Sequence, residues 1–124
     1  MFENYNPNPT GKNVGDCTVR AISKALDQSW DETYIGLALQ GYLMGDMPSA
    51  NAVWGAYLRR KGMRRHLIPE ECPDGYTVND FADEHPQGTF ILALSSHVVC
   101  VKDGTIFDSW NSGGEVPIYF WKKE

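Results

Sequence analysis

Residues 97–108 read H-V-V-C-V-K-D-G-T-I-F-D, and this stretch decides the fold of the C-terminal half of the chain. Two runs rich in β-branched and apolar residues flank Asp103-Gly104, a dipeptide that is typical of a tight two-residue β-turn. The pattern therefore predicts a β-hairpin with one strand on each side of this turn. With Asp103-Gly104 as the turn, Lys102 pairs with Thr105, and the register of the whole hairpin follows.

This register places a histidine and an aspartate on one face of the hairpin. Side chains alternate between the two faces of a strand, so His97, Asp108 and Trp110 are expected to share a face. The apolar residues of that face are Val99, Val101 and Ile106. A carboxylate on such a face is costly to bury without a partner, and the imidazole of His97 lies diagonally within reach of Asp108. The pair would leave one ring nitrogen free as a base under the indole of Trp110. The alternative is a solvated histidine and aspartate at the end of a sheet.

A candidate nucleophile lies in residues 14–21, V-G-D-C-T-V-R-A. Asp16 is expected to be the N-cap of a helix whose apolar positions recur at helical spacing, so Cys17 opens that helix. A helix N-terminus favours a thiolate, and the backbone N–H of Cys17 can donate to a developing oxyanion. The charge of Asp16 acts the other way, because a neighbouring anion raises the pKa of a thiol. The alternative interpretation is a small apolar residue at a helix start.

The remaining sequence predicts an α+β domain, with N-terminal helices packed on a C-terminal antiparallel β-sheet. Residues 1–13 are expected to form an extended arm. Ser29 begins a capping-box sequence, Gly45 ends the helix that follows, and Thr77 can cap a short helix. Other elements that the pattern predicts are a third helix from Ser49 or Asn51 to Gly62, strands over residues 90–94, 97–102, 105–108 and 116–121, and a loop over 63–76 with a short strand at 65–68.

Length and composition are typical of one packed domain. The chain has 124 residues, of which 42% are hydrophobic and 12% aromatic. No apolar run approaches the ~20 residues that a membrane-spanning helix needs, so no membrane association is expected. The first residues lack the charged and apolar regions of a signal peptide. Three cysteines without a C-x-x-C spacing suit a reducing compartment, and a cytoplasmic location is therefore expected.

The charge of the chain is unevenly distributed. The net charge is −5, which disfavours general nucleic-acid binding. Five of the eleven cations nonetheless fall within seven positions, at Arg59, Arg60, Lys61, Arg64 and Arg65. This cluster is interpreted either as a solvated helix end or as a patch for an anionic partner or an acidic substrate.

No cofactor is expected, and no metal site, because the cysteines and histidines show no recognisable zinc spacing. The residues concerned are His66, Cys72, His85 and Cys100.

A cysteine that opens a helix, then a histidine on one strand and an aspartate on the next, resembles the papain-like cysteine peptidase superfamily. Asp108-Ser109-Trp110 is similar to the N-S-W of papain, with aspartate in place of asparagine as in many bacterial members. The hairpin spacing and the opening N-P-N-P…G-D-C-T-V-R-A-I resemble small bacterial and phage members, such as bacteriocin-processing peptidase domains. The resemblance covers residues 8–121 and implies a papain-like fold.

The resemblance implies a thiol hydrolase that cleaves a peptide or isopeptide bond through an acyl-enzyme, with a peptide or protein as its substrate. Cys17 would be the nucleophile, His97 the base, Asp108 the residue that orients His97, and Trp110 a shield against water. The same chemistry can pass the acyl group to an amine, as in transglutaminase-like members. The rival function is a non-catalytic binding protein of phage or bacterial origin on the same fold. Polyanion binding through residues 59–65 is a third, less favoured one.

The sequence departs from the family at the oxyanion hole. The family usually has a glutamine about six residues before the cysteine, where this chain has Gly11, and no glutamine precedes Cys17. Asn6, Asn8 and Asn13 are the upstream amides that can replace it, and Asn8 in the N-P-N-P arm is preferred. Without such an amide, acyl transfer depends on the Cys17 N–H alone, and loss of one donor costs about 10²–10³ in rate.

Overall fold

The computed structural model describes residues 1–69, 72 and 74–123. Its elements, in chain order, are β1 (Phe2–Asn4), α1 (Cys17–Leu26), α2 (Trp30–Met44), α3 (Asn51–Arg60), β2 (Met63–Leu67), α4 (Val78–Glu84), β3 (Thr89–Ala93), β4 (Val98–Lys102), β5 (Thr105–Asp108) and β6 (Tyr119–Lys123). Within the described residues, six strands form one mixed sheet in the order β1-β5-β4-β3-β6-β2. The β1–β5 pair is parallel and the other pairs are antiparallel. The chain is therefore α+β, as the sequence predicts.

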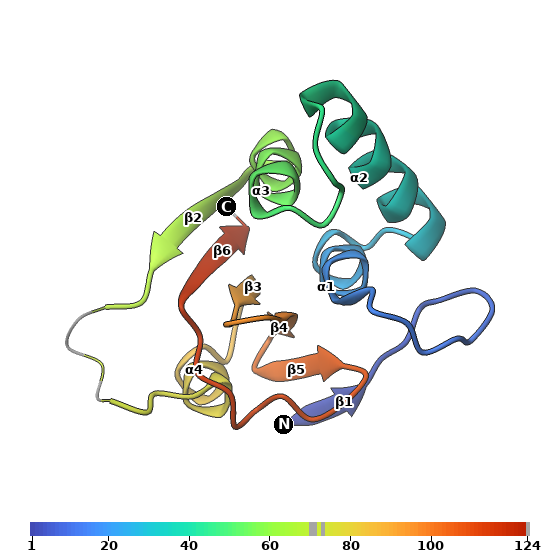
Figure 1. Ribbon diagram of the computed structural model, residues 1–124. Helices are drawn as coiled ribbons and strands as arrows, with labels where there is room; N and C mark the ends of the chain where they lie inside the picture. Colours follow the sequence, from blue (N-terminus) through green and yellow to red (C-terminus); the bar gives the residue numbers. More distant parts are fainter. Residues whose placement is uncertain (70–71, 73, 124) are drawn as a thin grey trace.

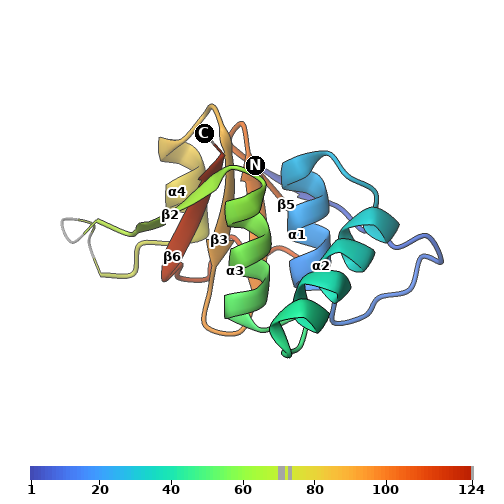
Figure 2. The same ribbon diagram turned by 90° about the horizontal axis from the view of Figure 1, so that it is seen from above.

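The helices cover the two faces of the sheet unequally. Helices α1, α2 and α3 lie on one face and α4 lies on the other (Figures 1 and 2). Helix α1 packs directly on β4, α3 packs beside β2, and α2 lies outside them against both helices. Each face of the sheet therefore carries its own apolar core.

Strand β3 shows how the sequence produces these two cores. Its run of apolar residues has no polar alternation, which is typical of a strand that is covered on both faces. Ile91 and Ala93 belong to the core under α1 and α3, whereas Phe90 and Leu92 belong to the core under α4. β3 lies between β4 and β6 in the sheet, so the prediction of a central strand is confirmed.

The hairpin forms with the predicted register. Lys102 pairs with Thr105, and the pairing continues along β4 and β5 to Cys100 and Phe107. The backbone φ angles of Asp103 and Gly104 are 50° and 77°, so both turn residues are left-handed, as a two-residue hairpin turn of this kind requires.

Local capping explains where two of the helices begin. The Ser29 hydroxyl accepts a hydrogen bond from the Glu32 N–H at 3.0 Å, and α2 starts one residue later. At α4, the Thr77 and Asp80 side chains each accept from the other residue's backbone N–H, which completes a capping box. α3 begins at Asn51, one of the two predicted starting points. The predicted helix starts are thus confirmed.

The structure differs from the sequence prediction at the edges of the sheet. Within the expected arm, Phe2–Asn4 is a strand that pairs with the distant β5, so the sheet is mixed and not purely antiparallel. β2 starts at Met63, two residues before the predicted strand, and residues 70, 71 and 73 of the predicted 63–76 loop lie outside the described residues. β6 starts later than predicted, at Tyr119, after Pro117. Short edge strands carry little local pattern, because their partners are far away in the sequence.

We expect Gly104→Ala to lower the free energy of unfolding by about 1–2 kcal/mol, because a side chain at a left-handed position is strained. Urea denaturation measures this loss. The matched control is Gly114→Ala, whose added methyl group meets no atom within 4 Å and whose φ is not left-handed. Equal unfolding midpoints for the two variants would show that the hairpin does not depend on this turn.

Candidate functional site

Cys17 is the first residue of α1 and follows the loop that ends at Asp16. Asp16 occupies the N-cap position, but its side chain makes no capping hydrogen bond. Its carboxylate instead pairs with Arg20 at 2.5 Å and accepts a hydrogen bond from the Trp30 indole at 2.8 Å. Arg20 therefore offsets the negative charge that was expected to raise the pKa of the neighbouring thiol.

His97 and Asp108 meet at the ends of two neighbouring strands. His97 lies directly before β4, where its backbone carbonyl accepts a hydrogen bond from the Leu94 N–H at 2.8 Å. Asp108 is the last residue of β5. The His97 Nε2 and Asp108 Oδ2 atoms are 2.6 Å apart. The predicted contact between these side chains is confirmed.

The predicted shared face is only partly right. Val99, Val101 and Ile106 belong to the core on the α4 side of the sheet. Asp108 instead contacts Arg20, which comes from α1 on the other side. The strict alternation of side chains fails here because His97 lies outside β4 and Asp108 ends β5.

The Asp108 carboxylate is fully buried and has several donors around it. One oxygen accepts from Arg20 Nη2 at 2.9 Å and from the Ser109 N–H at 2.8 Å, and the other accepts from the Ser112 hydroxyl at 2.6 Å and contacts His97. Burial works to raise the pKa of Asp108, but the hydrogen bonds from His97 and Ser112 lower it below the ordinary value. The carboxylate is therefore held in its ionised form.

Sequence reasoning missed Arg20 and Ser112. Arg20 lies one helical turn after Asp16, a spacing that indicates an ion pair between these two residues. Nothing in the sequence connects Arg20 with Asp108, which lies 88 positions later. Ser112 carried no signal beyond its closeness to Asp108.

The thiol and the imidazole shift each other's ionisation. Burial opposes ionisation of Cys17 most strongly, yet hydrogen bonds with His97 and with the Val98 backbone, and the charge of His97, lower the pKa of the thiol below its ordinary value. Burial also opposes protonation of His97, but hydrogen bonds with Asp108 and Cys17 raise its pKa to about 9. Because the Nε2 atom of His97 contacts Asp108, Nδ1 is the ring nitrogen that remains available to interact with Cys17. The two pKa shifts favour a thiolate–imidazolium pair.

Trp110 covers one side of the imidazole. The two rings lie 4.8 Å apart between centroids, at 42° to each other. The His97 side chain is 14% exposed, whereas Trp110 itself is 45% exposed. Trp110 thus lies where the sequence predicts a shield, with its outer side open to solvent.

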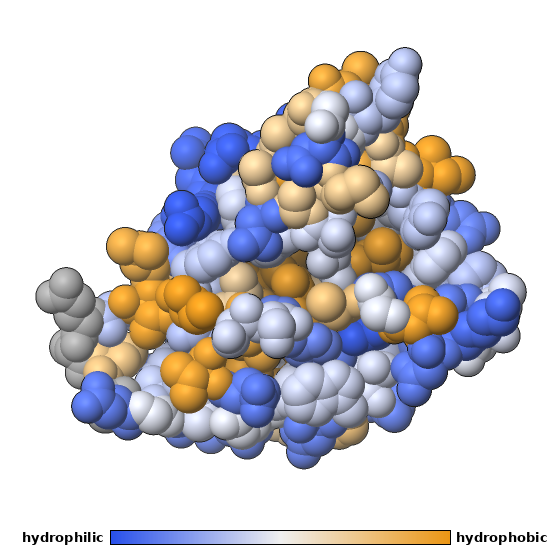
Figure 3. Space-filling model, in the orientation of Figure 1, coloured by the Kyte–Doolittle hydropathy of each residue, from blue (hydrophilic) through white to orange (hydrophobic). Residues whose placement is uncertain are grey.

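A cleft of about 360 Å³ gives access to the pair. The N-terminal ends of α1 and α3 and the turn between β3 and β4 lie at the same end of the molecule (Figure 2). The lining of the cleft includes Cys17, Asn51, Trp54, His97 and Tyr119. This end faces the viewer in Figure 3, where hydrophobic atoms lie in the central hollow. A ligand in the cleft would contact both the thiol and the imidazole.

The predicted oxyanion residues Asn8 and Asn13 do not line this cleft. The Asn8 side-chain oxygen accepts hydrogen bonds from the Thr10 backbone N–H at 2.9 Å and from its hydroxyl at 2.8 Å, and Asn13 is exposed to solvent. Local bonds of this kind hold the arm in its own turns. The cleft lining therefore does not support Asn8 or Asn13 as the oxyanion donor.

Asn51 is an amide that lines the cleft and that sequence reasoning did not select. It is the first residue of α3, and its side-chain oxygen accepts a hydrogen bond from the Trp54 indole at 3.1 Å. This bond fixes the amide and leaves its NH₂ group as the donor. A single asparagine at a helix start carries no catalytic signal, so only the fold reveals its position.

The other cysteines and histidines lie elsewhere. Cys100 is buried in the core under α1 and α3, and burial raises the pKa of its thiol to about 12. His85 stacks on Phe81 with 3.8 Å between ring centroids. Among the residues that the structure describes, no group of three or more His, Cys, Asp or Glu side chains is placed to hold a metal ion. In the same part of the chain, no helix has the length and apolar character needed to cross a membrane.

Comparisons of the chain with protein-family models, with curated proteins and with solved structures find no match.

Cys17 is expected to react with iodoacetamide at a lower pH than an ordinary thiol, because His97 stabilises the thiolate. The variant His97→Ala is expected to move the midpoint of the pH profile upward. Site-resolved alkylation against pH, read by mass spectrometry, measures both effects. Cys100 provides an unreactive reference in the same chain, since it is fully buried. A Cys17 midpoint that is ordinary and unchanged in His97→Ala would contradict the pairing.

Asp108→Ala is expected to lower the free energy of unfolding by about 3–5 kcal/mol, because it breaks a buried ion pair: Arg20 keeps only Asp16 as a carboxylate partner, and His97 loses its own. Ser112→Ala removes a neutral donor and should cost about 1 kcal/mol. Because the native pKa of Asp108 is lowered, its ionisation stabilises the fold above its unfolded pKa of about 3.8, and this contribution is lost as the pH falls. Urea denaturation of both variants between neutral and acidic pH tests the assignment, and an equally small loss in Asp108→Ala would contradict it.

Proposed function

We propose that this chain is a thiol hydrolase of the papain-like type, a small bacterial or phage-type member, which cleaves a peptide or isopeptide bond. The observation that carries the proposal is the 2.6 Å contact between His97 Nε2 and Asp108 Oδ2, with Cys17 and His97 lining one cleft. A nucleophile, a base and a residue that orients the base are the parts that acyl transfer by a thiol requires.

In the first half of the reaction, the Cys17 thiolate attacks the carbonyl carbon of the substrate and forms a tetrahedral intermediate. The intermediate collapses when the C–N bond breaks, and the leaving nitrogen takes the proton from the imidazolium of His97. The products of this step are a free amine and a thioester on Cys17. Asp108 keeps the ring of His97 oriented throughout, because it holds Nε2.

In the second half, neutral His97 removes a proton from a water molecule as that water attacks the thioester. The carboxylic acid leaves, and Cys17 returns as a thiolate beside the imidazolium. The proton that His97 gave to the amine is thus replaced by one from water. If an amine enters in place of water, the same steps yield acyl transfer.

Two donors are suited to the oxyanion of both intermediates. The backbone N–H of Cys17 lies at the start of α1, where the helix leaves its first N–H groups unpaired. Asn51 lines the same cleft, and the bond from Trp54 to its side-chain oxygen leaves its NH₂ group as a donor. Asn51 would then take the role of the glutamine that the chain lacks upstream of Cys17.

The order of elements supports the papain-like assignment. A cysteine opens the first helix, further helices follow, the histidine directly precedes β4, and the aspartate ends the antiparallel neighbour β5. An odd number of cysteines without a C-x-x-C spacing favours a reducing compartment such as the cytoplasm.

The wild-type protein is expected to be acylated at Cys17 by p-nitrophenyl acetate and to turn over slowly, with a burst of nitrophenol. His97→Ala should slow acylation by about 10²–10⁴-fold, because the thiolate loses its partner. Asn51→Ala should slow acylation by about 10²–10³-fold without moving the pH midpoint of Cys17 alkylation. Stopped-flow absorbance and intact-protein mass spectrometry measure the burst and the acyl-enzyme.

Cys17→Ala provides the control for background acetylation at other residues. A peptide p-nitroanilide library then tests amide cleavage, and added hydroxylamine separates acyl transfer from hydrolysis by the mass of the product. If wild type and Cys17→Ala release nitrophenol at the same rate, the enzyme function is wrong, and a non-catalytic binding protein is the better description.

A further inference from the structure

A second hollow adjoins the cleft and runs along α3. It measures about 300 Å³ and is lined by Asn51, Ala52, Gly55, Arg59, Arg65, Tyr119 and Trp121. Two of these residues, Asn51 and Tyr119, also line the cleft that contains Cys17. The two hollows therefore meet at this pair of residues, and we call the second one the α3 groove.

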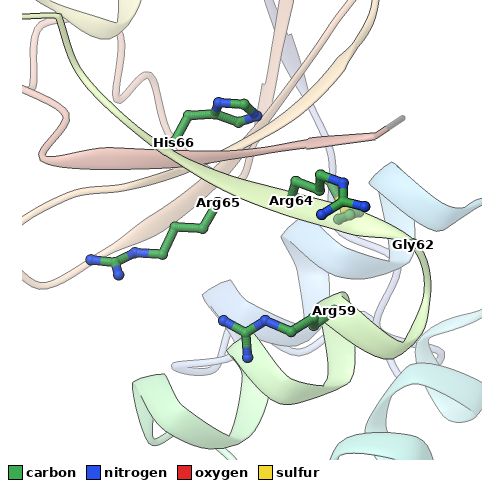
Figure 4. Close-up of a pocket in the computed structure, with 6 residues that line it drawn as sticks. Arg59, Gly62, Arg64, Arg65 and His66 are labelled. Carbon is green, nitrogen blue, oxygen red and sulfur yellow. The ribbon is translucent and has the colours of Figure 1, made fainter.

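Two guanidinium groups stand in the α3 groove. Arg59 comes from the C-terminal end of α3 and Arg65 comes from β2, and in Figure 4 their side chains lie on the same side of the β2 ribbon. His66 points to the opposite side of that ribbon, as strand alternation requires. The guanidinium of Arg65 lies over the ring of Tyr119 at 4.4 Å, and that of Arg59 lies 5.3 Å from the ring of Trp121.

Arg59 and Arg65 contact aromatic rings, whereas Arg20 and Lys102 form ion pairs with carboxylates. Arg20 pairs with buried carboxylates, and Lys102 pairs with Asp27 at 3.0 Å. Within residues 1–69, 72 and 74–123, no carboxylate lies within ion-pair distance of the Arg59 or Arg65 guanidinium. Stacking on an aromatic ring orients the planar guanidinium and leaves its N–H groups available for a bidentate carboxylate.

We propose that the α3 groove binds an acidic side chain of the substrate through Arg59 and Arg65, so that the enzyme selects acidic peptides. This inference rests on the proposed function, because it makes the groove an extension of the catalytic cleft. Asn51 and Arg59 lie eight residues apart on α3, which is about 12 Å along the helix axis. An extended peptide covers that distance in about four residues, so the acidic residue lies three or four positions from the cleaved bond.

The shape and charge of the surface favour a peptide over a nucleic acid. Hydrophilic residues gather at the corner of the molecule where α3 meets β2 (Figure 3). The cationic site is nonetheless short, and the net charge of −5 repels a long polyanion. A peptide needs only one carboxylate at the groove while its carbonyl group lies at Cys17.

The test uses peptides that carry an electrophile in place of the cleaved bond, either as an N-terminal chloroacetyl group or as a C-terminal chloromethyl ketone. Each peptide is made with Glu or with Gln at the third or fourth residue from the electrophile. In one of the two series, chloroacetyl or chloromethyl ketone, the Glu peptide is expected to alkylate Cys17 about tenfold faster than the Gln peptide at low salt. The reason is that the Glu carboxylate forms exposed ion pairs with Arg59 and Arg65. The preference should shrink at about 0.5 M salt, where such pairs are screened.

The variant Arg59→Gln/Arg65→Gln is expected to lose this preference. The control Lys61→Gln/Arg64→Gln removes the same charge from the same region, but neither residue lines the α3 groove, so it should keep the preference. Iodoacetamide, which has no peptide part, is expected to react equally fast with all three proteins. Equal rates for the Glu and Gln peptides, with rapid iodoacetamide reaction, would refute the acidic preference and leave the proposed function intact.

A binding measurement makes the inference independent of the reactivity of Cys17. Fluorescence anisotropy with Cys17→Ala and labelled Glu or Gln peptides should show the same preference and the same loss in the Arg59→Gln/Arg65→Gln background. If the Glu peptide binds preferentially while wild-type Cys17 reacts as an ordinary thiol, the groove is supported and the hydrolase is not. If a short oligothymidylate binds more tightly than the Glu peptide and depends on the same two arginines, the groove is a nucleic-acid site and the inference is overturned.

Discussion

The buried carboxylate of Asp108 is the interaction on which the rest of the site depends. It joins α1 to the end of β5 through Arg20, and it holds the ring of His97 at the end of β4. A fully buried anion is stable only if its partners are fixed in place, so the helix and the strands are held in one arrangement. That arrangement brings the first residue of α1, Cys17, to the other side of the same imidazole.

The same carboxylate thus has a structural and an electrostatic role. Arg20, Ser109 and Ser112 donate hydrogen bonds to it, and its own hydrogen bond with His97 and its charge help to raise the pKa of that imidazole to about 9 against the effect of burial. The imidazolium in turn lowers the pKa of Cys17. Fold stability and thiol activation are therefore coupled, and a variant that isolates the chemistry from the fold is better made at Cys17 than at Asp108.

The sequence was sufficient for features that depend on local rules. The Asp103-Gly104 turn determined the hairpin register, and the register predicted the contact between His97 and Asp108. Features that depend on distant partners escaped prediction, such as the pairing of β1 with β5 and the bond from Arg20 to Asp108. The sequence predicted an oxyanion amide upstream of Cys17, whereas the packing of α3 places a different amide, that of Asn51, among the residues that line the cleft. Local patterns reveal turns, caps and faces, whereas the meeting of separate elements at one cleft is a property of the folded chain.

The pairing of β1 with β5 also has a consequence for the order in which the chain becomes active. The first strand finds its partner only when residues 106–108 have been synthesised, and the Tyr5 N–H then donates to the Asp108 carbonyl at 2.8 Å. Contacts between residues so far apart in the sequence form late, since the whole intervening loop must close. Until residues 97–108 have been synthesised and folded onto α1, Cys17 lacks the imidazole that lowers the pKa of its thiol. The ionisation of this cysteine is therefore a property of the assembled sheet and not of the helix that carries it.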